Sequence, residues 1–75
     1  MLLTDLIAAV LDVDPAFLGE ESGRGTLEMW DSLAHLNIIA AVEETYGVLF
    51  SSSEMRGLTS VGSIREALAT RNVAA

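Results

Sequence analysis

A serine at the predicted start of a helix is the residue of this sequence with the clearest chemical potential. Ser32 follows Asp31 and precedes Leu33, and this tripeptide comes directly after Trp30, where a long stretch with helical apolar periodicity begins. We expect the serine hydroxyl to be exposed on the loop side while Leu33 turns toward the core. Such a hydroxyl is suited to be a covalent attachment point. The simpler interpretation is that Asp31 and Ser32 only begin a helix, because Asp is a preferred N-cap residue.

Ser32 has no evident partner for nucleophilic catalysis. A serine at its normal pKa is a poor nucleophile unless an adjacent base removes its proton. His35 is the single histidine and lies three residues further on, but no third residue is evident to orient its imidazole, and no oxyanion hole is recognisable. We therefore expect His35 to face solvent and the chain to have no catalytic site. A metal site is not indicated either, since one histidine and scattered carboxylates lack ligand spacing.

Two amphipathic helices are predicted on either side of a long loop. Residues 3–13 carry apolar side chains at three- and four-residue steps, and residues 32–46 do so again, between Asp31 as N-cap and Gly47 at the C-terminal end. The apolar face expected for the second helix comprises Leu33, Leu36, Ile39, Ala40, Val42 and Tyr46. The loop exceeds the length of an ordinary connection. We expect four of its side chains to pin it to the core, namely Phe17, Leu18, Leu27 and Trp30.

Two shorter helices are predicted in the last third of the chain. Ser53 can cap a short helix that extends through Leu58, and Ser60 can cap the last helix. The apolar stripe expected on that last helix comprises Val61, Ile64, Ala67 and Leu68. The predicted fold class is therefore all-α. We expect residues 1–75 to form a single domain, a small irregular four-helix bundle with a short third helix and a long loop between helices one and two.

The charge balance narrows the classes of partner. Eleven acidic residues face four arginines, lysine is absent, and the formal net charge is −7. Nucleic acid is an unsuitable partner because phosphate binding depends on clustered Lys and Arg. Basic protein surfaces are the natural complement, although the acids can also serve only to keep a small apolar domain soluble. No apolar run is long enough for membrane insertion. The N-terminus lacks a basic leader and the chain lacks cysteine, so we expect a cytoplasmic protein.

Several motifs together resemble those of the acyl carrier protein family. They span nearly the whole chain and comprise Trp30-Asp31-Ser32-Leu33 with Leu36, Val42-Glu43-Glu44, Tyr46-Gly47-Val48 and Val61-Gly62-Ser63-Ile64. An Asp-Ser-Leu tripeptide alone is a weak signal, but these motifs come at the family's spacing. The resemblance implies that Ser32 receives a 4′-phosphopantetheine arm from coenzyme A through a separate magnesium-dependent phosphopantetheinyl transferase. The thiol of that arm would hold acyl groups as thioesters, and the protein itself would catalyse no reaction.

The resemblance also implies roles for the residues around Ser32. Asp31 is expected to help the transferase recognise the site as well as to cap the helix, and Leu33 either to pack inward or to contact the arm or a partner. The second helix is the family's main docking surface. The residues expected to contact partner enzymes there are Ala34, Asn37, Ile38, Glu43 and Glu44.

One departure from the family's pattern bears on the pathway. Ala34, His35 and Asn37 stand where carriers of fatty acid synthesis usually show further acids. We therefore expect a specialised pathway for a polyketide, a lipopeptide or another secondary metabolite, more than bulk fatty acid synthesis. Its partners would read apolar contact near Ala34 and Ile38 as much as charge.

The expected partners are the transferase, an acyl-loading ligase or acyltransferase, and downstream acyl-modifying or condensing enzymes. The sequence begins at a methionine and ends soon after the last helix, which predicts a discrete carrier, with an excised domain of a megasynthase as the alternative. We expect the carrier to be a monomer. Two alternatives to the function also stay open. A peptidyl or aminoacyl carrier shares the fold and the modified serine, although Met29-Trp30-Asp31-Ser32 does not resemble its usual motif. A non-modified acidic helical adaptor would use Asp31 and Ser32 only as helix-starting residues.

Overall fold

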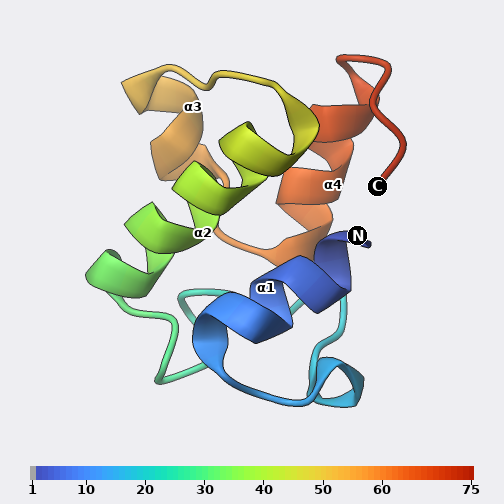
Figure 1. The fold of residues 1–75 in the computed structure, drawn as a ribbon. Helices are drawn as coiled ribbons and strands as arrows, with labels where there is room; N and C mark the ends of the chain where they lie inside the picture. Colours follow the sequence, from blue (N-terminus) through green and yellow to red (C-terminus); the bar gives the residue numbers. More distant parts are fainter. Residues whose placement is uncertain (1) are drawn as a thin grey trace.

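The computed structural model describes residues 2–75, which contain four α-helices and no strand. In chain order the elements are α1 (Leu3–Leu11), a 3₁₀ turn η1 (Pro15–Phe17), α2 (Ser32–Tyr46), α3 (Ser52–Gly57) and α4 (Val61–Ala69). Figure 1 shows α3 beside α2 and the long α1–α2 loop running along one end of the molecule. The all-α bundle with a short third helix and a long first loop is thereby confirmed.

Helix α1 is two residues shorter than the sequence predicts. It ends at Leu11 because Asp12 adopts the left-handed conformation, with φ 58° and ψ 48°, and its N–H donates back to the carbonyls of Ala8 and Ala9. Asp14 then accepts a hydrogen bond from the N–H of Ala16 and begins η1, with Pro15 in the first position of that turn. The apolar periodicity continues through residue 13, but the backbone turns at Asp12 before the pattern ends.

The α1–α2 loop is attached by backbone hydrogen bonds to the segment that begins α4. Ser22 accepts from the N–H of Val61 at 2.9 Å, Glu20 accepts from the N–H of Gly62 at 2.9 Å, and the N–H of Arg24 donates to Thr59 at 3.0 Å. Gly23 lies in this contact, and a Cβ atom there would stand 1.9 Å from the Thr59 carbonyl oxygen. The close approach of two backbones therefore requires glycine at position 23.

Three of the four expected anchors of this loop are confirmed. Trp30 is fully buried, and Leu18 and Leu27 are half-buried against the core. The expectation for Phe17 is wrong, since 58% of its surface is exposed. It is the last residue of η1, and the residue after the turn, Leu18, is the one that packs on the core.

Helix α2 begins and ends where the sequence predicts. Asp31 Oδ1 accepts a 2.9 Å hydrogen bond from the N–H of Ala34, and Gly47 ends the helix in the left-handed conformation, with φ 67°. The predicted apolar face is wrong at three positions. Leu33 and Leu36 are 67% and 55% exposed, and Ala40 is also exposed. The buried residues of the helix are instead His35, Ile38, Ile39 and Val42. They follow an i, i+3, i+4, i+7 pattern whose first position is held by a histidine.

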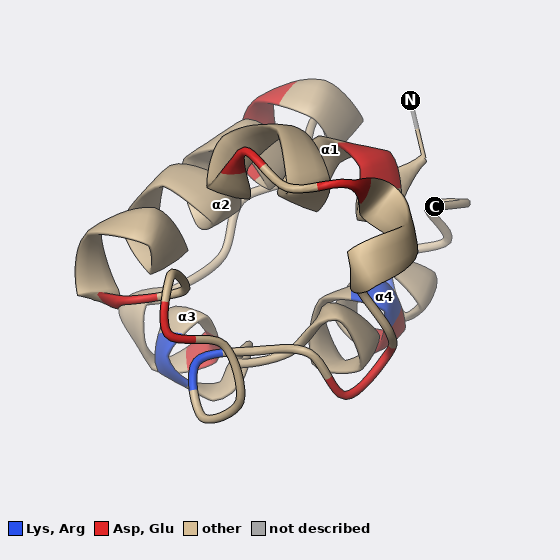
Figure 2. Cartoon of the chain, turned by 90° about the horizontal axis from the view of Figure 1, so that it is seen from below, with Lys and Arg blue, Asp and Glu red and all other residues tan. Residues whose placement is uncertain are grey.

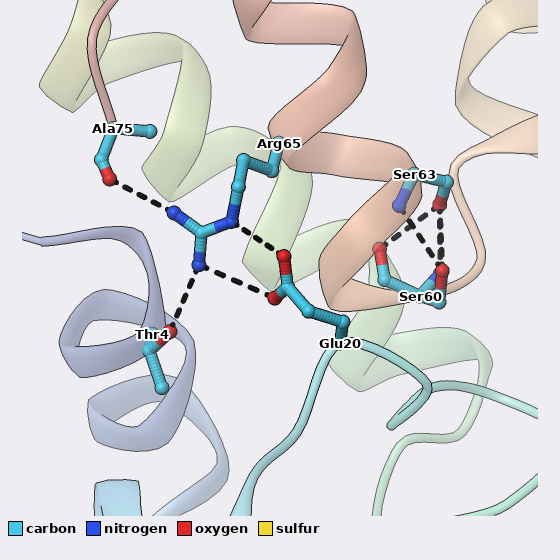
Figure 3. A network of polar contacts seen from close by, with 6 residues as sticks. All are labelled: Thr4, Glu20, Ser60, Ser63, Arg65 and Ala75. Carbon is cyan, nitrogen blue, oxygen red and sulfur yellow. Dashed lines mark hydrogen bonds and ion pairs between the residues drawn. The ribbon is translucent and has the colours of Figure 1, made fainter.

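Helices α3 and α4 both begin with reciprocal side-chain caps. Ser51, not the expected Ser53, caps α3, because its hydroxyl accepts from the N–H of Glu54 while the Glu54 carboxylate accepts from the N–H of Ser51. Ser60 caps α4 as predicted, with Ser63 completing the second capping box (Figure 3). The expected stripe of α4 is confirmed by the burial of Val61, Ile64 and Leu68, with Ala67 half-buried.

Arg65 on α4 ties three distant segments together. Its guanidinium forms an ion pair with Glu20 of the long loop, at 2.7 Å from Nε to Oε1, and donates to Thr4 of α1 and to Ala75 near the C-terminus (Figure 3). The ion pair with Glu20 adds a side-chain contact to the backbone hydrogen bonds that attach the α1–α2 loop to the start of α4. The loop that leads to Ser32 is thus held on a fixed framework.

Candidate functional site

Ser32 is exposed and is the first residue of α2. Its position is set by Asp31, whose side chain caps the helix and whose carbonyl accepts the 2.8 Å hydrogen bond from His35 that forms the first turn. The Ser32 Oγ atom accepts a 2.9 Å hydrogen bond from Nη2 of Arg24 in the long loop. The positive end of the helix dipole and the N–H groups of the first turn lie at this position. The hydroxyl is therefore reachable from solvent at a place where negative charge is favoured.

An open hollow of about 190 Å³ lies beside Ser32, where the loop, α2 and α3 meet. Its lining residues are Arg24, Ser32, His35, Leu36, Met55 and Arg56. Figure 2 shows basic positions in α3 and in the loop next to it, and acidic positions occur in the same two segments as well as elsewhere in the chain. The hollow thus combines a hydroxyl, an apolar wall and two guanidinium groups.

His35 forms the floor of the hollow and joins two segments. It is only 4% exposed, which overturns the expectation of a solvent-facing histidine. Its Nδ1 atom accepts from Nε1 of Trp30 at 3.1 Å, and Nε2 lies 2.8 Å from the carbonyl oxygen of Met55. Because the indole can only donate and the carbonyl can only accept, the neutral tautomer with hydrogen on Nε2 satisfies both contacts. Burial of this polar side chain is tolerated because both ring nitrogens have partners.

Because of these contacts, His35 is not available as a base for the Ser32 hydroxyl. Both ring nitrogens are engaged with Trp30 and Met55, and the partner of the Ser32 hydroxyl is the guanidinium of Arg24. A guanidinium cannot act as a base at neutral pH because it is already protonated and has no acceptor atom. The arrangement offers a positioned hydroxyl and no activated nucleophile.

The residues expected to contact partners are placed unequally. Asn37 and Glu44 are exposed and Ala34 is half-buried on α2. Ile38 is fully buried in the core, so the expected apolar contact at that position is wrong. Glu43 is half-buried, and its Oε2 atom accepts a 2.9 Å hydrogen bond from the N–H of Phe50, which fixes the α2–α3 connection. Since 67% of Leu33 is exposed, its inward-packing alternative is also wrong.

A comparison with solved structures decides the family. The solution NMR structure of a holo acyl carrier protein from Geobacter metallireducens superimposes with a TM-score of 0.79. The two sequences are 31% identical, and the match covers 91% of this chain and 78% of the other. This chain belongs to the acyl carrier protein family. No family model and no curated protein matched the sequence.

Membership of the acyl carrier protein family makes the chain a carrier protein in general terms, and the resemblance carried by the Ser32 motif is confirmed at the level of the family. No helix in residues 2–75 has the length and apolar character needed to cross a membrane. The same described residues hold no cluster of three or more His, Asp or Glu side chains that could bind a metal ion.

Sequence reasoning missed four residues that line the hollow of this acyl carrier protein, namely Arg24, Leu36, Met55 and Arg56. The spacing of Leu36 predicts a core position, and a hydrogen bond from His35 to the Met55 carbonyl, far along the chain, joins α3 to α2. One signal was available in the sequence. The chain has only four arginines, and one of them, Arg24, lies eight residues before Ser32 in the loop that leads to it.

Two side chains, one on α3 and one at the far end of α2 from Ser32, have shifted pKa values. The hydrogen bond from Arg71 and the capping N–H of Ser51 lower the pKa of Glu54 on α3 below its usual 4.5. Partial burial raises the pKa of Tyr46, at the end of α2, above its usual 10.0. Glu54 therefore stays ionised at neutral pH and holds α3 to the chain that follows α4.

Proposed function

We propose that residues 1–75 form one carrier domain that holds acyl groups as thioesters on a 4′-phosphopantetheine arm attached to Ser32. The observation that supports this most directly is the exposed Ser32 hydroxyl at the start of α2 in a chain with the acyl carrier protein fold. The arm, when attached, supplies the thiol that forms the thioester. These residues fit a phosphate-linked group. The Ser32 hydroxyl supplies the ester oxygen, the hollow has room beside it for the attached chain, and the two arginines supply positive charge for the phosphate.

In the proposed loading reaction Ser32 is the acceptor and an external transferase supplies the catalysis. Ser32 Oγ forms a bond to the phosphorus that bears the pantetheine of coenzyme A. The phosphoanhydride bond to that phosphorus breaks, and the adenosine bisphosphate portion leaves. The hydroxyl proton passes to a base of the transferase, since His35 is engaged and Arg24 cannot accept it. We infer that the carrier is a substrate of other enzymes and catalyses no reaction itself.

The proposed docking surface for partner enzymes lies on the exposed side of α2. Leu33 and Leu36 are exposed there, together with Asn37 and Glu44, and Ala34 is half-buried between them. Exposed leucines near Ser32 and few acids in the first half of the helix favour partners that bind by apolar contact as well as by charge. We propose that these are an acyl-loading ligase or acyltransferase and condensing or acyl-modifying enzymes of a specialised pathway. Asp31 would be read by the transferase as part of the same surface.

The assignment to a specialised pathway would be contradicted if the acylated protein were turned over normally by a complete set of fatty acid synthesis enzymes. Since coenzyme A is an intracellular donor, we expect the carrier to act in the cytoplasm and, because recognition requires its α2 surface to be free, as a monomer.

The test of the proposed function is the intact mass of the purified protein before and after incubation with coenzyme A, magnesium and a promiscuous phosphopantetheinyl transferase. The control variant is Ser53→Ala, because Ser53 is an exposed serine on α3. We expect the parent and Ser53→Ala each to gain one phosphopantetheinyl group, and Ser32→Ala to gain none. A folded, unmodified parent protein that gains no mass would contradict the carrier function and favour the helical adaptor.

A further inference from the structure

We propose that Arg24 and Arg56 form a phosphate clamp, which binds the phosphodiester of the group attached to Ser32 and holds it over the hollow between α2 and α3. The proposal rests on the proposed function, because it concerns the anion that modification of Ser32 would introduce. It assigns to two arginines of this chain a role that the family assignment does not supply.

The contact between Arg24 and Ser32 already has the required geometry. Nη2 of Arg24 lies 2.9 Å from Ser32 Oγ, the oxygen that would bridge to phosphorus. A guanidinium carries five N–H donors in a planar fork that matches two oxygens of a phosphate. An ester oxygen is a poorer acceptor than the ionised oxygens bonded to the same phosphorus. Modification would therefore move the hydrogen bond donated by Arg24 from Oγ to those charged oxygens, which are bonded to the same phosphorus.

Arg56 approaches the same place from the other wall. It is exposed on the last turn of α3 and lines the hollow together with Arg24 and Ser32. Within residues 2–75 the ion pairs use the other two arginines, Arg65 with Glu20 and Arg71 with Glu54. The guanidinium groups that flank Ser32 are thus not neutralised by a carboxylate in the described part of the chain.

Both arginines are carried by segments that the fold fixes relative to Ser32. The N–H of Arg24 donates to the Thr59 carbonyl at 3.0 Å, in the contact where position 23 has no room for a side chain. The residue before Arg56 is Met55, whose carbonyl oxygen lies 2.8 Å from Nε2 of His35 on α2. The loop and α3 therefore present their guanidinium groups to the start of α2 without a rearrangement of the backbone.

The charge distribution favours an anion at this point despite the acidity of the whole chain. The protein has a net charge of −7, and its four arginines are the counter-charges available. Two of them border the hollow, and the positive end of the α2 dipole adds to their field. The adjacent Asp31 carboxylate opposes this, although its Oδ1 atom is engaged by the N–H of Ala34. Another negative charge can therefore be accommodated at Ser32 with less repulsion than elsewhere on the surface.

The clamp is tested on protein that has been loaded to completion, as verified by intact mass. The variants are Arg24→Gln, Arg56→Gln and Arg24→Lys. The matched control is Ala40→Glu, which makes the same change in net charge at an exposed position of α2 two turns away from Ser32. The first readout is the phosphorus NMR chemical shift of the phosphodiester in low salt, compared with the shift of the same sample in denaturant. The second is the difference in Tm between the loaded and unloaded forms.

We expect the parent and Ala40→Glu to show a phosphorus shift in the folded state that is distinct from the shift in denaturant. We also expect the increase in Tm on loading to be larger in these two proteins than in Arg24→Gln, by roughly 2–4 °C. In Arg24→Gln the phosphorus signal should move most of the way to its denatured position. Arg56→Gln should move it part of the way, and Arg24→Lys should retain part of the displacement because a lysine keeps the charge without the fork.

A phosphorus shift and a loading-dependent Tm that are the same in the parent, Arg24→Gln and Arg56→Gln would overturn the clamp while leaving the carrier function intact. Failure of the parent to gain mass would overturn the proposed function itself. Folding of each variant is checked by circular dichroism in the unloaded form, where the side chain of Arg24 contacts only the exposed hydroxyl of Ser32 among the hydrogen bonds described above.

Discussion

At the scale of single residues, the site depends on a histidine that takes the place of an apolar side chain. The sequence predicts the N-cap Asp31 and the exposed Ser32 because capping requires only local chemistry. It does not predict the burial of His35, since that depends on two partners, Trp30 five residues before it and the Met55 carbonyl twenty residues after it. Because a polar residue occupies a core position, apolar spacing predicts Leu33 and Leu36 on the buried face of α2, where the structure has His35 instead.

The contribution of His35 can be measured by substitution. His35→Ala leaves the Nε1–H group of Trp30 buried without its partner and opens a cavity between α2 and α3. We expect the free energy of unfolding to fall by about 2–4 kcal/mol. Asn37→Ala, at an exposed position of the same helix, should change it by less than about 0.5 kcal/mol. Urea unfolding of the three proteins measures both values, and equal stability of the two variants would refute the structural role of His35.

At the scale of elements, local signals predicted which helices exist, while contacts between elements decided their bounds and faces. Ser51 caps α3 in preference to Ser53 because only Ser51 has a glutamate three residues later to complete the capping box. That pattern is visible in the sequence, among three consecutive serines. The attachment of the long loop to α4 was not predictable, because backbone hydrogen bonds between residues 20–24 and 59–62 leave no side-chain signature except a glycine.

The loop attachment predicts a large difference between two neighbouring glycines. Gly23→Ala would place a Cβ atom 1.9 Å from the Thr59 carbonyl oxygen, and backbone on both sides would have to move. We expect a loss of about 1–3 kcal/mol in the free energy of unfolding. Gly25→Ala meets no atom within 4 Å and should be neutral or slightly stabilising. Chemical denaturation compares the two, and a Gly23→Ala protein as stable as Gly25→Ala would contradict the described loop contact.

The cap of α3 predicts a pH dependence. The pKa of Glu54 is lowered in the folded protein by Arg71 and by the N–H of Ser51. A carboxyl with a depressed folded-state pKa stabilises the fold above its unfolded-state pKa, and the contribution is lost as pH falls through the folded-state value. Glu54→Gln keeps a capping side chain but removes the charge.

We therefore expect the parent to have a higher Tm than Glu54→Gln at pH 7, with a difference that shrinks as pH falls below about 4.5 and disappears in stronger acid. Scanning calorimetry over this range gives the difference directly. A difference in Tm that stays constant from pH 7 to strong acid would show that the charge of Glu54 is not responsible.

At the scale of the whole molecule, the fold class followed from the sequence because apolar periodicity and caps are sufficient to identify four helices. Their assembly depends on interactions between residues far apart in sequence, such as the contacts of Arg65 with Thr4, Glu20 and Ala75. The net charge of −7 is a property of the whole surface. An acidic surface attracts basic partner proteins over long distances, which raises the association rate, and salt screens this attraction.

Loading by the transferase should therefore slow as ionic strength rises. Between low salt and about 0.3 M NaCl we expect kcat/KM for the carrier to fall several-fold, with the change mainly in KM. Glu44→Gln, which removes one exposed acid from α2, should show a smaller dependence on salt. Steady-state loading assays measure both, and a rate for the parent that is independent of ionic strength would contradict the electrostatic part of the account.

The most direct test of the central claim is to locate the added group within the loaded protein. Trypsin cleaves after arginine, so the peptide from Gly25 to Arg56 contains Ser32 together with Ser51, Ser52 and Ser53. Fragmentation of this peptide by tandem mass spectrometry distinguishes the four serines. We predict that the phosphopantetheinyl group is found on Ser32 alone. Its presence on another serine, or its absence from a folded protein exposed to an active transferase, would contradict the account.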